Sequence, residues 1–155
     1  MAYENVTIIV WHAPPDPAAV ERLRHVSERR RKQYPNGISA VHFIKGQFEL
    51  PNAPTRDAFV RLVREGEGTL NVLAVIVSGA GFWASAVRSL ITSFRVLSRG
   101  NFDLGFYASV EELMKLLPEK HRVRTGVTLA PEALARALRR ADAFEQPEDP
   151  FKMSL

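Results

Sequence analysis

The chain has 155 residues, of which 46% are hydrophobic and 25% charged, and its formal net charge is +4. This composition is that of one soluble globular domain and excludes an intrinsically disordered chain. The absence of cysteine excludes disulfides, thiolate metal sites and cysteine nucleophiles. Since no apolar run approaches the roughly 20 residues that span a bilayer, and the first residues lack a secretory pattern, we expect a cytoplasmic protein without a transmembrane segment.

The first predicted unit is a strand followed by a helix. The β-branched run Val6–Trp11 predicts a strand, and the prolines that follow it break the strand. Asp16 is a suitable N-cap for a helix that starts at Pro17 and runs to about Gln33. The apolar side chains of that helix share one side, which indicates packing on a core.

A second unit repeats the same order. The run Ile38–Ile44 predicts a strand, and a polar, proline-containing connection follows it. We expect Thr55 to cap the next helix, and Gly66 and Gly68 to end it.

The third unit has the clearest pattern in the chain. The run Leu70–Val77 is almost continuously apolar, as expected of a central strand that helices bury on both faces. A glycine turn leads into a helix from about Phe82 to Ser98. Its predicted inner face consists of Trp83, Val87, Leu90, Ile91, Phe94 and Leu97.

A fourth strand is expected over residues 102–108, followed by another helix. Ser109 and Glu112 have the spacing of a capping box, and Pro118 is expected to close that helix. After it we expect a basic linker over residues 121–126 and a last helix from Pro131, which either packs on the domain or serves for docking. The tail from residue 146 is expected to be loosely held.

Four strand-then-helix units predict an α/β domain with about four mostly parallel strands, joined by right-handed crossovers and covered by helices. We place this domain at residues 1–120, with the linker and extra C-terminal helix at 121–145. The turn after the third strand then lies at the rim of the sheet.

Two stretches resemble a known family. The string Val-Ser-Gly-Ala-Gly-Phe-Trp-Ala-Ser-Ala-Val over residues 77–87 is similar to the STAS domains of anti-sigma-factor antagonists, their lipid-transport relatives and SpoIIAA-like proteins. The string Asn-Phe-Asp-Leu-Gly-Phe-Tyr-Ala-Ser-Val-Glu-Glu-Leu over residues 101–113 resembles their closing strand and acidic capped helix. The likeness covers residues 70 to 117, with Ala84 where the family usually has Asp and Val87 where glycine is usual.

The resemblance implies a regulatory or scaffolding module that acts by binding a protein partner, a second copy of the chain included, rather than an enzyme. Ser85 falls on the family's phosphoacceptor position. Arg88, Ser89 and Ser78 lie near it in the sequence, and a helix N-terminus favours a phosphate or another anion. The alternative is that Ser85, Arg88 and Ser89 are simply the exposed polar side of an amphipathic helix.

Two groups of side chains are candidates for an interaction surface. Phe82 and Trp83 lie at the start of the third helix, where they are either a docking surface or part of the core. The first helix carries a basic cluster that could bind nucleic acid or an anionic membrane, diluted by acidic neighbours: Arg22, Arg24, Arg29, Arg30, Arg31 and Lys32.

A third hypothesis places a small-molecule site or an enzyme in the crevice at the carboxyl ends of the strands. His12 follows the first predicted strand there, with Asp16 and Ser78 as candidate partners. The four histidines have no metal-ligand spacing, and the glycine turn lacks a complete nucleotide fingerprint. We therefore expect no metal and no cofactor.

Overall fold

A five-stranded sheet organises the fold. The computed structural model describes residues 1–143, so the expected tail from residue 146 lies outside the described residues. The strands lie in the order β1-β2-β3-β4-β5. Their bounds are Ala2–Tyr3, Val6–Trp11, Ile38–Ile44, Leu70–Val77 and Asp103–Tyr107 for β1 to β5. The four strands predicted from the sequence are confirmed, and they pair in parallel.

The edge strand β1 was not predicted. Its two residues pair antiparallel with β2, where Ala2 is opposite Thr7 and Tyr3 is opposite Val6. A two-residue strand is too short to show any hydrophobic alternation. Its pairing depends on a tight turn at Glu4, whose φ of 46° is left-handed.

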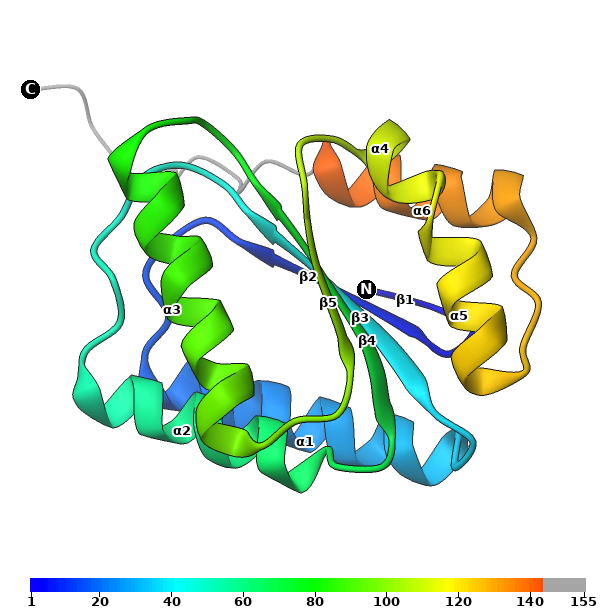
Figure 1. Cartoon of the computed structure of the whole chain (residues 1–155), viewed down its shortest axis with the longest axis horizontal. Coiled ribbons are helices and arrows are strands. Elements are labelled where there is room, and N and C mark those ends of the chain that lie inside the picture. The colour runs from blue at the N-terminus through cyan, green and yellow to red at the C-terminus, as the bar shows by residue number, and fades with distance from the viewer. Residues whose placement is uncertain (144–155) are drawn as a thin grey trace, which may run out of the picture.

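Three crossover helices cover one face of the sheet (Figure 1). They are α1 (Pro17–Gln33), α2 (Ala53–Glu65) and α3 (Phe82–Ser98). Strands β2 to β5 lie side by side in chain order, so crossovers of one hand place every connecting helix on the same face. The close backbone approaches of α2 are to α1 and α3.

The opposite face is covered by the last three helices of the described chain (Figure 1). They are α4 (Val110–Met114), α5 (Leu117–Thr125) and α6 (Pro131–Asp142). The sequence-based linker over residues 121–126 is therefore wrong, because most of it is the second half of α5. Pro118 lies in the first turn of α5 rather than closing the preceding helix, since proline needs no backbone partner at that position. The last helix packs on the domain against β2.

Burial follows these two layers. Strand β4 has a neighbour on each side and is buried on both faces from Val72 onward, as its continuous apolar sequence predicts. The second face holds the larger core, to which α4, α5 and α6 contribute mainly leucines: Leu113, Leu117, Leu134 and Leu138. Among the described residues, no helix combines the length and apolar character needed to cross a membrane.

The helix caps agree with the sequence at most positions. Asp16 caps α1 by accepting a hydrogen bond from the backbone N–H of Ala19 at 2.6 Å. Ser109 accepts from the N–H of Glu112 at 3.2 Å, and the Glu112 carboxylate accepts from the N–H of Ala108 at 2.6 Å. These contacts confirm the predicted start of α4.

Two predictions about helices need correction. Helix α2 is capped by Asn52, which accepts from both the N–H and the hydroxyl of Thr55; Thr55 itself is buried one turn into the helix. In α3, Leu97 is 60% exposed although the pattern placed it on the inner face. Phe94 and Ser98, four residues apart, take the buried line at that end of the helix, and Leu97 lies to one side.

Candidate ligand cavity

A cavity of about 130 Å³ lies between the sheet and the layer of helices α1, α2 and α3. We call it the sheet–helix cavity. Its floor is the helix-facing side of β2, β3 and β4, and its walls come from the three helices and from the β3–α2 connection. The floor consists of Thr7, Ile9, Trp11, Ile38, Ala40, His42, Ile44, Leu70, Leu73 and Val75. The walls include Leu23, Ser27, Arg31, Phe48, Leu50, Phe59, Leu62, Val87, Ile91 and Phe94.

Strand register explains which side chains form the floor. Alternate residues of a strand point to the same face, so Ala40, His42 and Ile44 of β3 share the cavity side. Ile9 of β2 and Val75 of β4 are both paired with His42. The floor is thus a continuous apolar surface with one imidazole near its centre.

Aromatic side chains hold the helices above this floor. The Trp11 and Phe59 rings meet edge to face, with centroids 6.0 Å apart. Phe59 of α2 then stacks on Phe94 of α3, with centroids 5.4 Å apart. All three rings also line the cavity.

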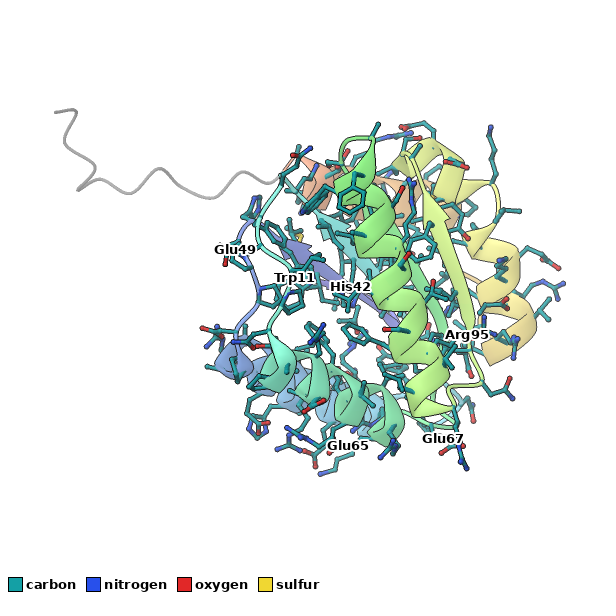
Figure 2. The ribbon with its side chains drawn as sticks, turned by 60° about the vertical axis from the view of Figure 1, so that its left-hand side comes forward. Trp11, His42, Glu49, Glu65, Glu67 and Arg95 are labelled. Atoms are coloured by element: carbon teal, nitrogen blue, oxygen red, sulfur yellow. The ribbon has the colours of Figure 1, made fainter. Side chains whose placement is uncertain are left out.

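A hydrogen bond joins the side chains of Trp11 and His42, which both line the cavity. The indole Nε1–H donates to His42 Nδ1 at 3.1 Å. Figure 2 shows the two side chains between α2, α3 and the connection that follows β3. Burial lowers the pKa of His42 to about 4, so the imidazole is neutral at neutral pH. In the sequence, His42 stands out only as one of four histidines without metal-ligand spacing. Its alternation with Ala40 and Ile44 along β3 was the signal that could have placed its side chain on the helix-facing side of the sheet.

Other polar groups line the cavity toward the amino ends of the parallel strands. Ser27 and Arg31 lie on α1 at a spacing of four residues, on the same side as Leu23. Arg31 was predicted to belong to a basic surface, but it is half-buried and lines the cavity. Thr7 also lies on the floor, but its hydroxyl oxygen is enclosed by protein atoms, and no described residue partners it.

Trp83 has a structural role at the rim. Its indole N–H donates to the carbonyl oxygen of Phe48 at 2.8 Å, and its ring meets that of Phe48 edge to face. These contacts tie the start of α3 to the β3–α2 connection. Of the two aromatic candidates for an interaction surface, Trp83 is therefore half-buried, whereas Phe82 is 91% exposed.

The predicted anion site is an exposed corner. Ser85, Arg88 and Ser89 are all exposed on α3, and the preceding turn through Gly79 and Gly81 is exposed as well. The backbone N–H of Ser85 already donates to Gly81, so it is not free for an anion. Ser78 is half-buried and its backbone N–H donates to Ile44.

The basic cluster on α1 is largely paired within the described chain. Arg24 forms an ion pair with Glu21 at 2.8 Å, and Lys32 forms one with Glu28 at 2.9 Å. The Arg30 guanidinium donates to the carbonyl of Glu4 and lies over the Tyr34 ring. Arg22 and Arg29 are exposed to solvent.

The predicted crevice residues do not form a recognisable catalytic group. His12 is half-buried just after β2, and the Asp16 carboxylate is used as the cap of α1. Within residues 1–143 there is no cluster of three or more histidine, cysteine or acidic residues able to hold a metal ion. The predicted crevice at the carboxyl ends of the strands stays a prediction, whereas the cavity described above lies between the sheet and the helices.

A second histidine lies in a sealed network on the opposite face. His121 Nδ1 is 2.7 Å from Ser39 Oγ, and His121 Nε2 is 2.7 Å from Asn5 Oδ1. Serine, histidine and asparagine in this order suggest nucleophilic catalysis, but Ser39 and His121 are 0% exposed and Asn5 is 1% exposed. No substrate reaches the Ser39 hydroxyl, so the network is structural. No local sequence pattern points to this network, because its members are distant in the chain.

Comparisons of the chain with models of protein families, with curated proteins and with solved structures find no match.

Proposed function

We propose that the protein binds a small apolar molecule in the sheet–helix cavity. The observation that carries this proposal is the cavity itself, which has a floor of strand residues such as Ile9 and Val75 and aromatic walls such as Phe59 and Phe94. Ligand sites in proteins are typically concave and mostly apolar, with few polar groups. This cavity has that composition.

The packing of the molecule supports the same proposal. Protein interiors are close-packed, so the side chains that line an apolar cavity of about 130 Å³ make fewer contacts than ordinary core residues. A molecule that fills the cavity recovers contacts that the side chains lack, and it stabilises the folded state by mass action.

The direct test compares ligand binding by the wild type with binding by a variant whose cavity is filled by a larger side chain. Single-ring aromatic compounds are expected to raise the melting temperature and to change the fluorescence of Trp11, which lines the cavity. Ala40→Leu adds three carbons on the cavity floor and is expected to abolish both effects. Ala18→Leu, at an exposed position of α1, is the matched control and keeps them. Equal binding by both variants, or no binding by the wild type, would contradict the proposal.

A second candidate function rests on the exposed start of α3. Phe82 is 91% exposed there, and Ser85, Arg88 and Ser89 are exposed beside it. A large aromatic ring next to a cation and two hydroxyls is typical of a protein-interaction surface. This corner is where the STAS resemblance implies contact with a regulatory partner, switched by a phosphate on Ser85.

The second candidate is tested by recovering bound proteins and titrating each purified partner against variants. Phe82→Ser and Arg88→Ala are expected to weaken the interaction, and Ser85→Asp is expected to change it. Leu97→Ser removes another exposed apolar side chain from the far end of α3 and serves as the control. Identical affinities for Phe82→Ser, Leu97→Ser and the wild type would show that this corner is not the surface.

A further inference from the structure

The Trp11–His42 contact fixes where the proton of His42 lies. The indole Nε1–H of tryptophan can only donate, so His42 Nδ1 accepts in this 3.1 Å hydrogen bond. A neutral imidazole carries one proton, and that proton is therefore on Nε2. His42 presents a hydrogen-bond donor at its other ring nitrogen.

The His42 side chain that carries this donor lines the sheet–helix cavity. No described residue accepts a hydrogen bond from His42 Nε2, and the side chain lines the cavity with part of its surface still accessible. Its strand neighbours on the floor, Ile9 and Val75, are apolar. His42 Nε2 is not among the enclosed polar atoms without a partner in the described chain, so a molecule in the cavity can reach it and accept from it.

The other polar groups of the cavity lining are enclosed or lie away from His42. The Thr7 hydroxyl oxygen is enclosed by protein atoms and cannot be reached from the cavity. Ser27 and Arg31 lie one and two helical turns after Leu23 on α1, which runs toward the amino ends of the parallel strands. His42 lies in the carboxyl half of β3, beside Trp11 at the carboxyl end of β2.

We propose that the cavity selects an uncharged molecule about the size of one six-membered ring, bearing a single hydrogen-bond acceptor that receives the Nε2–H of His42. This inference rests on the proposed binding function and adds the class of ligand. A cavity of about 130 Å³ is close to the roughly 150 Å³ that holds a benzene ring. A ketone or an ester carbonyl satisfies the donor, a hydrocarbon leaves it unpaired, and a carboxylate loses its hydration in apolar surroundings.

Three probes of similar shape separate these classes: acetophenone, ethylbenzene and benzoate. Binding is followed by calorimetry, and by Trp11 fluorescence in a Trp83→Phe background. The wild type is expected to bind acetophenone about tenfold more tightly than ethylbenzene, and benzoate most weakly. His42→Phe keeps a ring but removes the donor, so the preference for acetophenone is expected to vanish. His42→Gln keeps an acceptor for Trp11 and a donor for the ligand, and is expected to restore part of the preference.

The outcomes distinguish this inference from the proposed function. If none of the three probes binds the wild type, both are wrong. If ethylbenzene and acetophenone bind equally, or if His42→Phe retains the preference, the cavity binds ligands but His42 does not select them. If benzoate binds most tightly and Arg31→Met abolishes its binding, the ligand class is a carboxylate held by Arg31, and the inference is overturned.

Discussion

His121 and Ser39 are 82 residues apart in the chain, yet the Ser39 hydroxyl lies 2.7 Å from His121 Nδ1 in a region closed to solvent. His121 Nε2 is equally close to the side-chain oxygen of Asn5, which can only accept. The proton of the neutral imidazole is therefore on Nε2, and the Ser39 hydroxyl donates to Nδ1. Three elements, β3, α5 and the turn before β2, are joined by these two bonds.

Removing the Ser39 hydroxyl is expected to destabilise the protein. Ser39→Ala leaves the buried Nδ1 of His121 without a donor, which costs about 1–3 kcal/mol of unfolding free energy. Urea denaturation measures the change. Ser85→Ala, on the exposed side of α3, is the control and is expected to stay within about 0.5 kcal/mol of the wild type. Equal effects of the two substitutions would show that the network does not stabilise the fold.

Stability is expected to fall as the pH is lowered from about 6.5 toward 4. Burial lowers the pKa of both His42 and His121 from 6.5 to about 4. Between these values the unfolded chain binds more protons than the folded one, so the unfolding free energy decreases with falling pH. Each histidine contributes up to about 1.4 kcal/mol per pH unit in that range.

Urea unfolding curves at pH 7, 6 and 5 test this dependence. His42→Phe removes one of the two groups and is expected to reduce the slope between pH 6 and 5 by about half. An unfolding free energy that is constant over this range would contradict the buried, neutral state of both imidazoles.

The cap of α2 gives a third prediction. Asn52→Ala removes the acceptor of two hydrogen bonds, from the N–H of Thr55 at 3.1 Å and from its hydroxyl at 2.8 Å. The expected loss is about 1 kcal/mol, or a melting temperature lower by about 2–4 °C. Asn52→Asp keeps the acceptor and is expected to lose much less. If Asn52→Asp is as destabilising as Asn52→Ala, the side-chain cap is not the cause.

Any side chain at position 37, where the chain has Gly37, is expected to destabilise the folded protein. Its φ is +125°, and a Cβ atom there would lie 1.9 Å from the side-chain nitrogen of Asn71, which donates to the carbonyls of Asn36 and Arg124. Gly37→Ala is therefore expected to cost about 2–4 kcal/mol through backbone strain and the lost Asn71 contacts. Gly46→Ala is the control: its φ is +80° but its surroundings are open, so the expected cost is about 1 kcal/mol. Thermal unfolding of both variants measures the difference.

Much of the fold could be predicted from local patterns. The bounds of β2, β3, β4, α1 and α3 follow from β-branched runs, amphipathic spacing and turn residues, and the structure confirms them. The sequence patterns led to wrong predictions where one local rule is compatible with two structures. Pro118 ends one helix or begins another, and only the packing of α5 against β4 decides between them. Because residues 121–126 have a basic character, they were predicted to be a linker. They belong largely to α5, whose buried side includes His121 and Thr125.

The candidate site could be predicted only in part. The exposure of Ser85 follows from the glycine turn and the polar side of α3, whereas the sequence left open whether Phe82 is exposed or part of the core. The sheet–helix cavity does not follow from any local pattern, because its lining comes from many segments of the chain. Whether side chains fill the space between two layers depends on contacts between distant segments, such as those of the Phe59 ring with Trp11 and Phe94.

The amino-acid sequence by itself determined the alternation of strands and helices and therefore a parallel sheet, since hydrophobic periodicity and chain chirality act along contiguous segments. Only the tertiary structure decided that His42 meets Trp11 beside an apolar cavity and that His121 is sealed against Ser39. The physical reason is that a histidine's burial, tautomer and partners depend on residues brought close by folding, and sequence distance does not encode those contacts.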